Sequence, residues 1–427
     1  MARKMKDSGI EWIGEIPEGW TCKRGKQLFV ETNERSKTGS EELLTVSHLT
    51  GVTPRSQKNV NMFMSESLVD YKVCHPGDLA ANTMWMWQGA IGVSRFHGVI
   101  SPSYNTYRQR TINYIPEYLD YLLRIRPLVD TYNAYSTGIT LSRLRLYPQS
   151  FLSIHFIVPP MDEQQKIATY LDVECSRIDA MLAKTRDSIK EYKKLKQAVI
   201  TQAVTKGVRG EREMKDSGNP WFGQIPADWK LTRVGLHFSI ILGKMLCNAP
   251  PNDTYTLEPY YCAADVHFDG VADGERKKMW FSPIEKDLYR VSVGDLLVVE
   301  GGAGAGGSAI VENQDSDTYI QNSIMIVRSK GNADNRYLRY LLEFLIKQGY
   351  IDIVCNKATI PHFTKDKLSC VPFCLCPTGE QKEIAAYLDA KCAEIDKLIA
   401  KKEQLVKELE SYRKSLIYEV VTGKREV

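Results

Sequence analysis

Long hydrophobic runs are missing from this sequence. A helix that spans a bilayer needs about 18 consecutive apolar residues, and no stretch of the 427 residues is that long. The first residues are basic and polar and lead into tryptophan-bearing sequence, so they lack the apolar core of a secretory signal. We therefore expect a cytoplasmic protein that makes no contact with a membrane, and its length suggests two to four domains.

A strong net charge is also missing. The chain carries 56 Lys and Arg against 52 Asp and Glu. By segment the balance is +4 for residues 1–160, +3 for 161–210, −3 for 211–376 and 0 for 377–427. A long basic groove that follows a nucleic-acid strand would need more positive charge than this. Local basic clusters on loops, which contact a short stretch of duplex, remain possible.

Motifs for catalysis are absent as well. The seven histidines are dispersed, and we find neither an amino-methyltransferase motif nor a nuclease-like cluster of carboxylates and lysine. The segment 301–307 contains a G-x-G-x-x-G, but Ser308–Glu312 after it reads as a strand, whereas a dinucleotide site needs a helix there. We therefore expect no catalytic residue, metal or cofactor on this chain. The loops at 85–92 and 301–307 either approach a ligand or are simply exposed turns.

The ten cysteines are scattered, so disulfides are the weaker interpretation for a reducing compartment. The tightest group is Cys370, Cys374 and Cys376, whose even spacing places all three on one face of an extended segment. A metal site with His362 is the alternative, but this is not a zinc spacing. We expect three small apolar side chains in a buried strand.

The most informative feature is an internal repeat. Residues 5–20 read MKDSGIEWIGEIPEGW and residues 214–229 read MKDSGNPWFGQIPADW, with ten of the sixteen positions identical. Residues 160–172 read PMDEQQKIATYLD and residues 377–389 read PTGEQKEIAAYLD. The chain is thus one unit of about 210 residues used twice.

Weaker matches lie between these strong ones. Gly77-Asp78-Leu79 recurs as Gly294-Asp295-Leu296, and the YLxYLL that begins at Tyr118 recurs at Tyr337. The glycine segments read as a turn followed by a strand, and the tyrosine segments read as helices. We also expect closing strands at 151–158 and 368–376. The globular parts are therefore predicted to be mixed α and β.

Each unit ends in a stretch of about 40 residues without proline, which predicts a helix roughly 60 Å long at 1.5 Å per residue. Apolar residues recur at spacings of three, four and seven, which gives one narrow stripe on each helix. Such a stripe cannot bury itself, so we expect the two helices to pair as a coiled coil. The alternative is that each helix docks separately on its own globular part. The residues predicted to make the pairing are Leu171, Ile178, Leu182 and Ile189, with Leu388, Ile395, Ile399 and Val406.

These motifs resemble a known family. Each repeat opens on W-x-G-x-I-P-x-x-W and enters its long helix through E-Q-x-x-I-A-x-x-L-D, as in the specificity subunit of type I restriction-modification systems. The resemblance covers essentially the whole chain. One departure is Thr378-Gly379, which stands where the first copy has Met161-Asp162.

The resemblance implies an α+β fold with pseudo-twofold symmetry. It implies recognition domains at 1–158 and 209–375, and spacer helices at 159–208 and 376–427 that pair antiparallel. Each recognition domain would read one half of a split, asymmetric target in double-stranded DNA, and the helices would set the spacer between the halves. Two modification subunits, which carry the S-adenosylmethionine chemistry, and two restriction subunits, which use ATP and Mg²⁺, would be its partners.

Base recognition needs hydrogen-bond donors in a groove and polar groups on the phosphates. In the first domain the segment 136–145 joins a glycine, hydroxyls and two arginines, and in the second domain 356–365 is its rough counterpart. The alternative for the arginines is that they simply face water. An aromatic and basic cluster at 104–110 is a further candidate, although aromatic residues in such strands are more often core. The residues predicted to contact DNA are Thr140, Ser142, Arg143, Arg145, Tyr107 and Arg108, with Lys357, Thr359, His362 and Lys365.

Two other interpretations stay open at this stage. A pure assembly scaffold would show the same repeated helices without any preference for a DNA sequence. A specificity subunit without a restriction partner of its own would have the same sequence features. Neither the target sequence nor the spacer length can be read from the residues.

Overall fold

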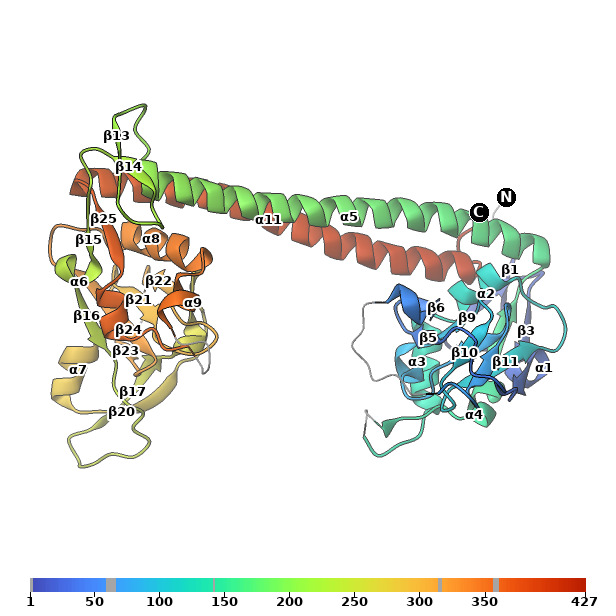
Figure 1. Cartoon of the computed structure of the whole chain (residues 1–427). Helices are drawn as coiled ribbons and strands as arrows, with labels where there is room; N and C mark the ends of the chain where they lie inside the picture. The colour runs from blue at the N-terminus through green and yellow to red at the C-terminus, as the bar shows by residue number, and fades with distance from the viewer. Residues whose placement is uncertain (1–2, 59–66, 141–142, 314–316, 356–360) are drawn as a thin grey trace. The chain divides into compact units, whose positions relative to one another are not determined.

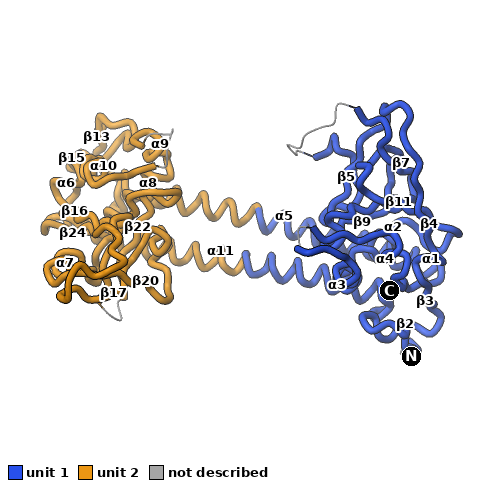
Figure 2. Tube along the Cα trace, turned by 90° about the horizontal axis from the view of Figure 1, so that it is seen from below, with its two compact units in different colours: residues 1–186, 403–427 blue, residues 187–402 orange. Residues whose placement is uncertain are grey.

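The computed structural model describes residues 3–58, 67–140, 143–313, 317–355 and 361–427. The chain divides into two compact units, residues 1–186 with 403–427 and residues 187–402 (Figure 2). The chain therefore returns to its first unit at its end. No helix in the described ranges is long and apolar enough to cross a membrane.

Unit 1 is built around a four-stranded antiparallel sheet of order β4-β11-β8-β9. Three two-stranded pairs, β3-β12, β7-β10 and β5-β6, and the hairpin β1-β2 surround it. The strands are β1 Met5–Asp7, β2 Glu15–Pro17, β3 Thr21–Arg24, β4 Phe29–Thr32, β5 Leu44–Ser47, β6 Gly51–Pro54, β7 Lys72–Cys74, β8 Leu79–Ala81, β9 Ile91–Val93, β10 Gly98–Ile100, β11 Asn105–Gln109 and β12 His155–Val158. The helices are α1 Gly25–Leu28, η1 Arg55–Gln57, η2 Met86–Gln88, α2 Pro116–Leu122, α3 Arg126–Tyr135 and α4 Pro148–Ser153.

Unit 2 repeats the four-stranded sheet with the order β16-β24-β21-β22, and β15-β25 and β13-β14 repeat the flanking pairs. It differs by a three-stranded sheet, β20-β17-β23, and a short hairpin, β18-β19. The strands are β13 Met214–Asp216, β14 Gln224–Pro226, β15 Lys230–Arg233, β16 Phe238–Leu242, β17 Thr256–Tyr261, β18 Val266–His267, β19 Gly270–Val271, β20 Lys277–Phe281, β21 Leu296–Val299, β22 Ser308–Ile310, β23 Tyr319–Ile320, β24 Ile324–Ser329 and β25 Pro372–Leu375. The helices are α6 Val234–His237, η4 Ala263–Asp265, α7 Pro283–Tyr289, α8 Asn335–Lys347, α9 Tyr350–Val354 and α10 Lys365–Ser369.

Figure 1 shows two long helices, α5 Met161–Lys206 and α11 Thr378–Val421. Each helix divides between the two units (Figure 2). Within unit 1 the guanidinium of Arg413 lies 3.2 Å from the carboxylate of Asp179, and Arg186 lies 2.5 Å from Glu410. Within unit 2 the ammonium of Lys196 lies 2.6 Å from Asp396. Residue numbers rise on one helix as they fall on the other, so the helices pack antiparallel in each unit. The predicted α+β fold with two packed helices is confirmed.

The helix ends complete the cores of the units. In unit 1, Leu416 and Val420 near the end of α11 lie in one apolar cluster with Trp20, Phe29 and Phe156 of the globular part. In unit 2 the end of α5 does the same, because Ile200 and Val204 lie in one cluster with Trp229. Each globular part therefore buries its tryptophan in a cluster that includes the C-terminal end of the long helix from the other repeat.

The predicted local elements are mostly correct, with two exceptions. The glycine turns at 77 and 294 lead into β8 and β21, and the tyrosine segments form α2 and α8. The segments expected to be closing strands begin as helices, α4 and α10, and only His155–Val158 and Pro372–Leu375 are strands. Proline at the first position of α4 favours that helix over an extended start.

The three cysteines do not share one strand face. Cys374 lies in β25, and both it and Cys376 are buried, whereas Cys370 ends α10 and is exposed. The expectation that all three are buried strand residues is therefore wrong for Cys370. The turn after α10 removes this residue from the strand, so even spacing along the sequence does not carry over to one face.

Candidate nucleic-acid interface

The two strongest sequence motifs meet in space. In unit 1 the indole Nε1 of Trp20 donates to Glu163 at 2.8 Å, and the guanidinium of Arg3, which is also ion-paired to Glu163, lies 5.5 Å from the Trp20 ring centroid. Trp20 ends the first motif and Glu163 opens the helix motif. The contact thus fixes the start of α5 on the globular part.

Unit 2 has an equivalent cluster, but its ion pairs and hydrogen bonds differ. Arg212 lies 5.2 Å from the ring centroid of Trp229 and 2.5 Å from the buried carboxylate of Glu380. Arg209 adds a bidentate pair to Glu383, with both distances 2.8 Å. A cation, an indole and a carboxylate therefore join motif to motif in both repeats.

The glutamine of each helix motif is a buried anchor. The side chain of Gln164 donates to the carbonyls of Asn113 and Pro159, both at 2.9 Å, and accepts from the amide of Ile115 at 3.0 Å. Gln381 donates to the carbonyl of Cys376 at 2.8 Å and accepts from the amide of Asp334 at 2.9 Å. These buried side-chain amides form the hydrogen bonds that the backbone groups of the loops would otherwise make with water.

A third pair of motifs is joined by tyrosine. The hydroxyl of Tyr121 in α2 donates to Asp172 in α5 at 2.7 Å, and that of Tyr340 in α8 donates to Asp389 in α11 at 2.8 Å. Burial, helped by the neighbouring carboxylate, raises the pKa of both tyrosines above the usual value. Both bonds link the globular part to the long helix with the hydroxyl protonated.

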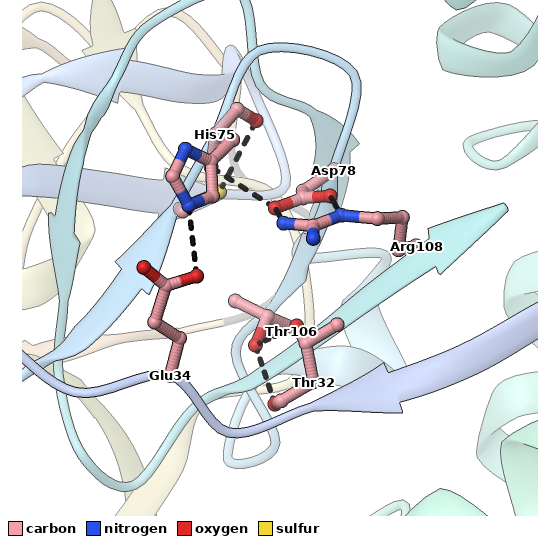
Figure 3. A network of polar contacts seen from close by, with 7 residues as sticks. Thr32, Glu34, His75, Asp78, Thr106 and Arg108 are labelled. Carbon is pink, nitrogen blue, oxygen red and sulfur yellow. Dashed lines mark hydrogen bonds and ion pairs between the residues drawn. The ribbon is translucent and has the colours of Figure 1, made fainter.

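The glycine turns hold a repeated ion pair, and Figure 3 shows its copy in unit 1. The carboxylate of Asp78 accepts from Nε and Nη2 of Arg108 at 2.7 and 2.8 Å, and Asp295 accepts from Arg328 at 2.8 and 2.7 Å. Each aspartate also accepts the backbone amide of the third residue before it, His75 at 3.0 Å or Ser292 at 2.8 Å. The bond to Asp78 raises the pKa of Arg108.

This ion pair changes the interpretation of Arg108. A DNA-contacting arginine has no reason to recur with the same partner in a second domain whose surrounding sequence differs. Arg108 and Arg328 do recur, on β11 and β24, which occupy matching places in the two sheets. The geometry favours a structural role for Arg108, which was predicted as a DNA contact.

Tyr107 is placed in the core. Its side chain is 1% exposed, and its ring centroid lies 4.6 Å from that of Phe151. A fully buried ring cannot reach a DNA groove, so the core interpretation of the aromatic cluster holds for this residue. Alternation along β11 decides the matter, because Tyr107 and Arg108 point to opposite faces.

In unit 1 the described residues 137–140 and 143–145 pair as the two arms of a hairpin. Thr137 and Arg145 exchange both backbone hydrogen bonds at 2.9 Å, and the amide of Arg143 donates to the carbonyl of Thr140 at 2.9 Å. The side chains of Thr140 and Arg143 are exposed, whereas Arg145 is partly buried and its Nη1 donates to the carbonyl of Leu144 at 2.8 Å. Ser142 lies outside the described residues.

In unit 2, Lys357 and Thr359 lie outside the described residues, and the structure places the other two predicted DNA contacts. His362 is exposed, forms an antiparallel bridge with Gly301, and its Nδ1 lies 3.3 Å from Glu300. Lys365 is exposed at the start of α10. The bridge brings the glycine-rich loop 301–307 beside the segment expected to read DNA. Sequence reasoning treated these as separate features.

The glycine-rich loop is followed directly by β22, Ser308–Ile310, as predicted. A strand presents no free helix N-terminus to a phosphate, so this loop lacks the geometry of a dinucleotide site.

The residues predicted to pair the helices divide by depth. Leu171, Ile178 and Leu182 lie in the core cluster of unit 1 with Leu416 and Val420, while Val406 is partly buried against it. Leu388, Ile395 and Ile399 are buried in unit 2, and Ile189 is half-buried. Two stripe positions beyond this set, Leu195 and Tyr412, are about half exposed. They are equivalent positions in the two repeats.

Comparison with known proteins relates part of this chain to a family. Residues 281–408 match the family model described as the type I restriction modification DNA specificity domain. Over these residues, which run from the end of β20 into α11, the chain is similar to that domain.

Two solved structures share the fold over nearly the full length. One is a chain from a structure described as the structural basis underlying complex assembly and conformational transition of the type I R-M system. It is 17% identical, covers 96% of this chain and 99% of its own, and has a TM-score of 0.73. The other is the HsdS subunit from Thermoanaerobacter tengcongensis, which is 18% identical with coverages of 96% and 98% and a TM-score of 0.55.

Proposed function

We propose that each globular domain reads one half of a split, asymmetric DNA target. We assign residues 1–158 to the first half, residues 209–375 to the second, and the helices at 159–208 and 376–427 to the spacer. One observation carries the proposal: the frame repeats down to single contacts, such as Asp78 with Arg108 and Asp295 with Arg328, while the loops around it differ. A repeated frame with different loops suits two different half-sites.

In the first domain the reading element is the hairpin 137–145. Its exposed Thr140 and Arg143 supply a hydroxyl and a guanidinium, the groups that bind phosphates and guanine edges. In the second domain His362 and Lys365 take this place at the edge of the glycine-rich loop. Ser142, Lys357 and Thr359, which lie outside the described residues, remain proposed DNA contacts on sequence grounds alone.

The antiparallel helices act as a ruler. A rigid spacer that holds two readers fits half-sites separated by a fixed length of duplex, as in other two-domain DNA-binding proteins. Apolar side chains that the pairing leaves exposed on these helices, among them Met181, Leu195 and Tyr412, offer docking surface for partners. We assign that surface to two modification subunits, with two restriction subunits completing the complex. The subunit itself performs no chemistry, and its partners bind and use S-adenosylmethionine, ATP and Mg²⁺.

The test is to co-express the chain with its modification subunit and to map methylated bases across the genome by single-molecule sequencing. The proposal predicts a bipartite motif with two unlike halves and a fixed spacer. A continuous motif, or methylation without sequence preference, would contradict it. The latter outcome would instead support an assembly scaffold.

A further inference from the structure

One loop frame occurs in both units at a place where the sequence repeat is not visible. The loop of the β8–β9 hairpin is closed by the amide of Asn82, which donates to the carbonyl of Ala90 at 2.9 Å. The loop of the β21–β22 hairpin is closed in the same way by Val299 and Gly307 at 2.8 Å. These residues are equivalent pairs, each 217 positions apart. The two loops therefore have the same length and the same closure.

A glycine presses each loop onto a helix. Gly89 and Gly306 have φ of +86° and +83°, so both adopt the left-handed conformation. A Cβ added to Gly89 would lie 2.8 Å from Cγ2 of Val129 in α3, and one added to Gly306 would lie 2.5 Å from Cδ1 of Ile346 in α8. Neither loop can lift from its helix without losing this close packing. The frame thus holds both loops in fixed positions.

The tips of the two loops differ strongly in the size of their side chains. Residues 85–88 are Trp-Met-Trp-Gln, whereas the equivalent residues 302–305 are Gly-Ala-Gly-Ala. The amide of the last residue donates to the carbonyl of the first in both tips, at 2.9 Å in unit 1 and 3.1 Å in unit 2. A shared frame therefore presents two indoles in one unit and almost no side chain in the other.

Contacts within unit 1 support the tryptophan tip. The rings of Trp85 and Trp87 stack with centroids 6.1 Å apart and planes 18° apart, and Nε1 of Trp87 donates to the carbonyl of Met84 at 3.1 Å. Below them the side chain of Asn82 donates to the hydroxyl of Tyr104 at 2.8 Å and accepts from the amide of Met84 at 3.2 Å. Trp85 nevertheless remains 48% exposed. An exposed indole on a rigid support is typical of a residue that anchors an interface.

The same helix connects this tip to the proposed reading hairpin. η2 of the tip packs on α3, and α3 ends at Tyr135, two residues before the hairpin begins at Thr137. Tyr135 is itself about half exposed. The tip therefore packs on the helix that leads into the element with the exposed guanidinium of Arg143. That positive charge favours the DNA backbone as the occupant.

We propose that Trp85 is a specificity-determining residue that contacts duplex DNA, through a thymine methyl group, in the half-site read by the first domain. This inference rests on the proposed function. The glycine tip of the second domain leaves its backbone accessible and lets DNA approach without a side-chain wedge. The two loops thus contribute differently to the two half-sites from one frame.

The experiment uses the full chain assembled with its modification subunit. Trp85→Ala, Trp85→Phe and a replacement of residues 85–88 by Gly-Ala-Gly-Ala are compared with the wild type by gel-shift titration on duplexes altered in one half-site or the other. Ile112→Ala, a change at another highly exposed apolar residue beside the Gln164 anchor, is the matched control. Thermal unfolding confirms that each variant is folded.

We expect Trp85→Ala and the tip replacement to weaken binding about tenfold and to relax discrimination in the first half-site only. Trp85→Phe should restore most of the affinity, and Ile112→Ala should leave it unchanged. If the folded Trp85 variants bind DNA and discriminate both half-sites as the wild type does, the inference is overturned and the proposed function stays intact. If the wild-type protein binds DNA without discriminating between altered and unaltered half-sites, the proposed function itself is overturned.

Discussion

The guanidinium of Arg108 binds both carboxylate oxygens of Asp78, at 2.7 and 2.8 Å, from the strand next to the turn that holds the aspartate. The side chain of Asp78 is 2% exposed and that of Arg108 is 47% exposed. The arginine therefore covers a carboxylate that would otherwise be buried without a counter-charge. The equivalent pair of Asp295 and Arg328 does the same in the second unit.

The first prediction follows from this pair. Arg108→Ala leaves the buried carboxylate of Asp78 without its counter-charge, so it should lower the stability of unit 1 by about 1–3 kcal/mol. Thermal unfolding should show this as a lower midpoint. Arg126→Ala, which breaks an exposed pair with Asp130 on the surface of α3, should change the midpoint far less. A variant of Arg108 that keeps its stability but loses one half-site would show that this residue reads DNA after all.

The second prediction concerns the hairpin. Arg143→Ala should weaken binding to the half-site of the first domain, by about tenfold if the arginine contacts a guanine edge. Assembly with the modification subunit should be unchanged because the side chain is exposed and lies outside the two long helices, to which we assign the docking surface. Gel-shift titration at fixed salt measures the effect, with Arg177→Ala on the exposed side of α5 as the control. Equal affinities for wild type and Arg143→Ala would reject the assignment.

The third prediction tests the helices as a ruler. Seven residues added to α5 alone should mismatch its stripe against α11 and impair folding or assembly. Seven residues added to both helices should keep the stripes matched and lengthen the spacer by about 10 Å, which is about three base pairs. Genome-wide methylation mapping would show the new spacer directly. An unchanged spacer in a folded double-insertion variant would argue against the ruler.

The fourth prediction is a dependence on alkaline pH. The pKa values of Tyr121 and Tyr340 are raised in the folded protein, chiefly by burial, whereas unfolded tyrosine ionises near pH 10. Their contribution to stability is therefore complete below about pH 10 and is lost as the pH rises further, because the unfolded chain then releases protons that the folded chain keeps.

The double variant Tyr121→Phe with Tyr340→Phe measures this contribution. It should be less stable than the wild type at pH 8, since two hydrogen bonds to Asp172 and Asp389 are lost. Its unfolding midpoint should fall less steeply between pH 9 and 11. Buried tyrosines and cysteines that do not contact these two hydroxyls contribute equally to both proteins and cancel in the comparison, whereas Cys175, which interacts with Tyr121, belongs to the measured effect. Parallel pH profiles would contradict a protonated role for the two hydroxyls.

Some of the candidate site was open to sequence reasoning and some was not. The matched motifs located Asp78, Glu163 and Gln164 but not their partners. Arg108 looked like a free DNA-binding cation because its ion pair joins residues 30 positions apart. The doubled Trp85 and Trp87 stood in the sequence as a loop of unusual composition. The sequence already matched this loop to the glycine-rich loop, and the structure adds the shared hydrogen bonds that give both loops one frame.

The helices show the same division. Periodicity alone identified a stripe that includes Leu171, Ile178 and Leu388, because helical spacing fixes which residues share a face. It also included Leu195 and Tyr412, which the structure leaves half exposed. An apolar stripe shows which residues lie on one side of a helix, but the packing of the partner helix determines how many of them are buried. The exposed pair lies at equivalent positions of the repeats, where the partner helix does not cover the full stripe.

The sequence by itself determined the duplication, the two long helices and the alternation of globular and helical parts, since repeats and apolar periods are local properties of a chain. The tertiary structure decided which residues are partners across the motifs, that Tyr107 is core and Arg108 is ion-paired, and that two unlike loops share one frame. These features depend on contacts between residues far apart in the chain, which no local pattern encodes. The internal repeat showed which segments matter, and the folded chain showed what each of them contacts.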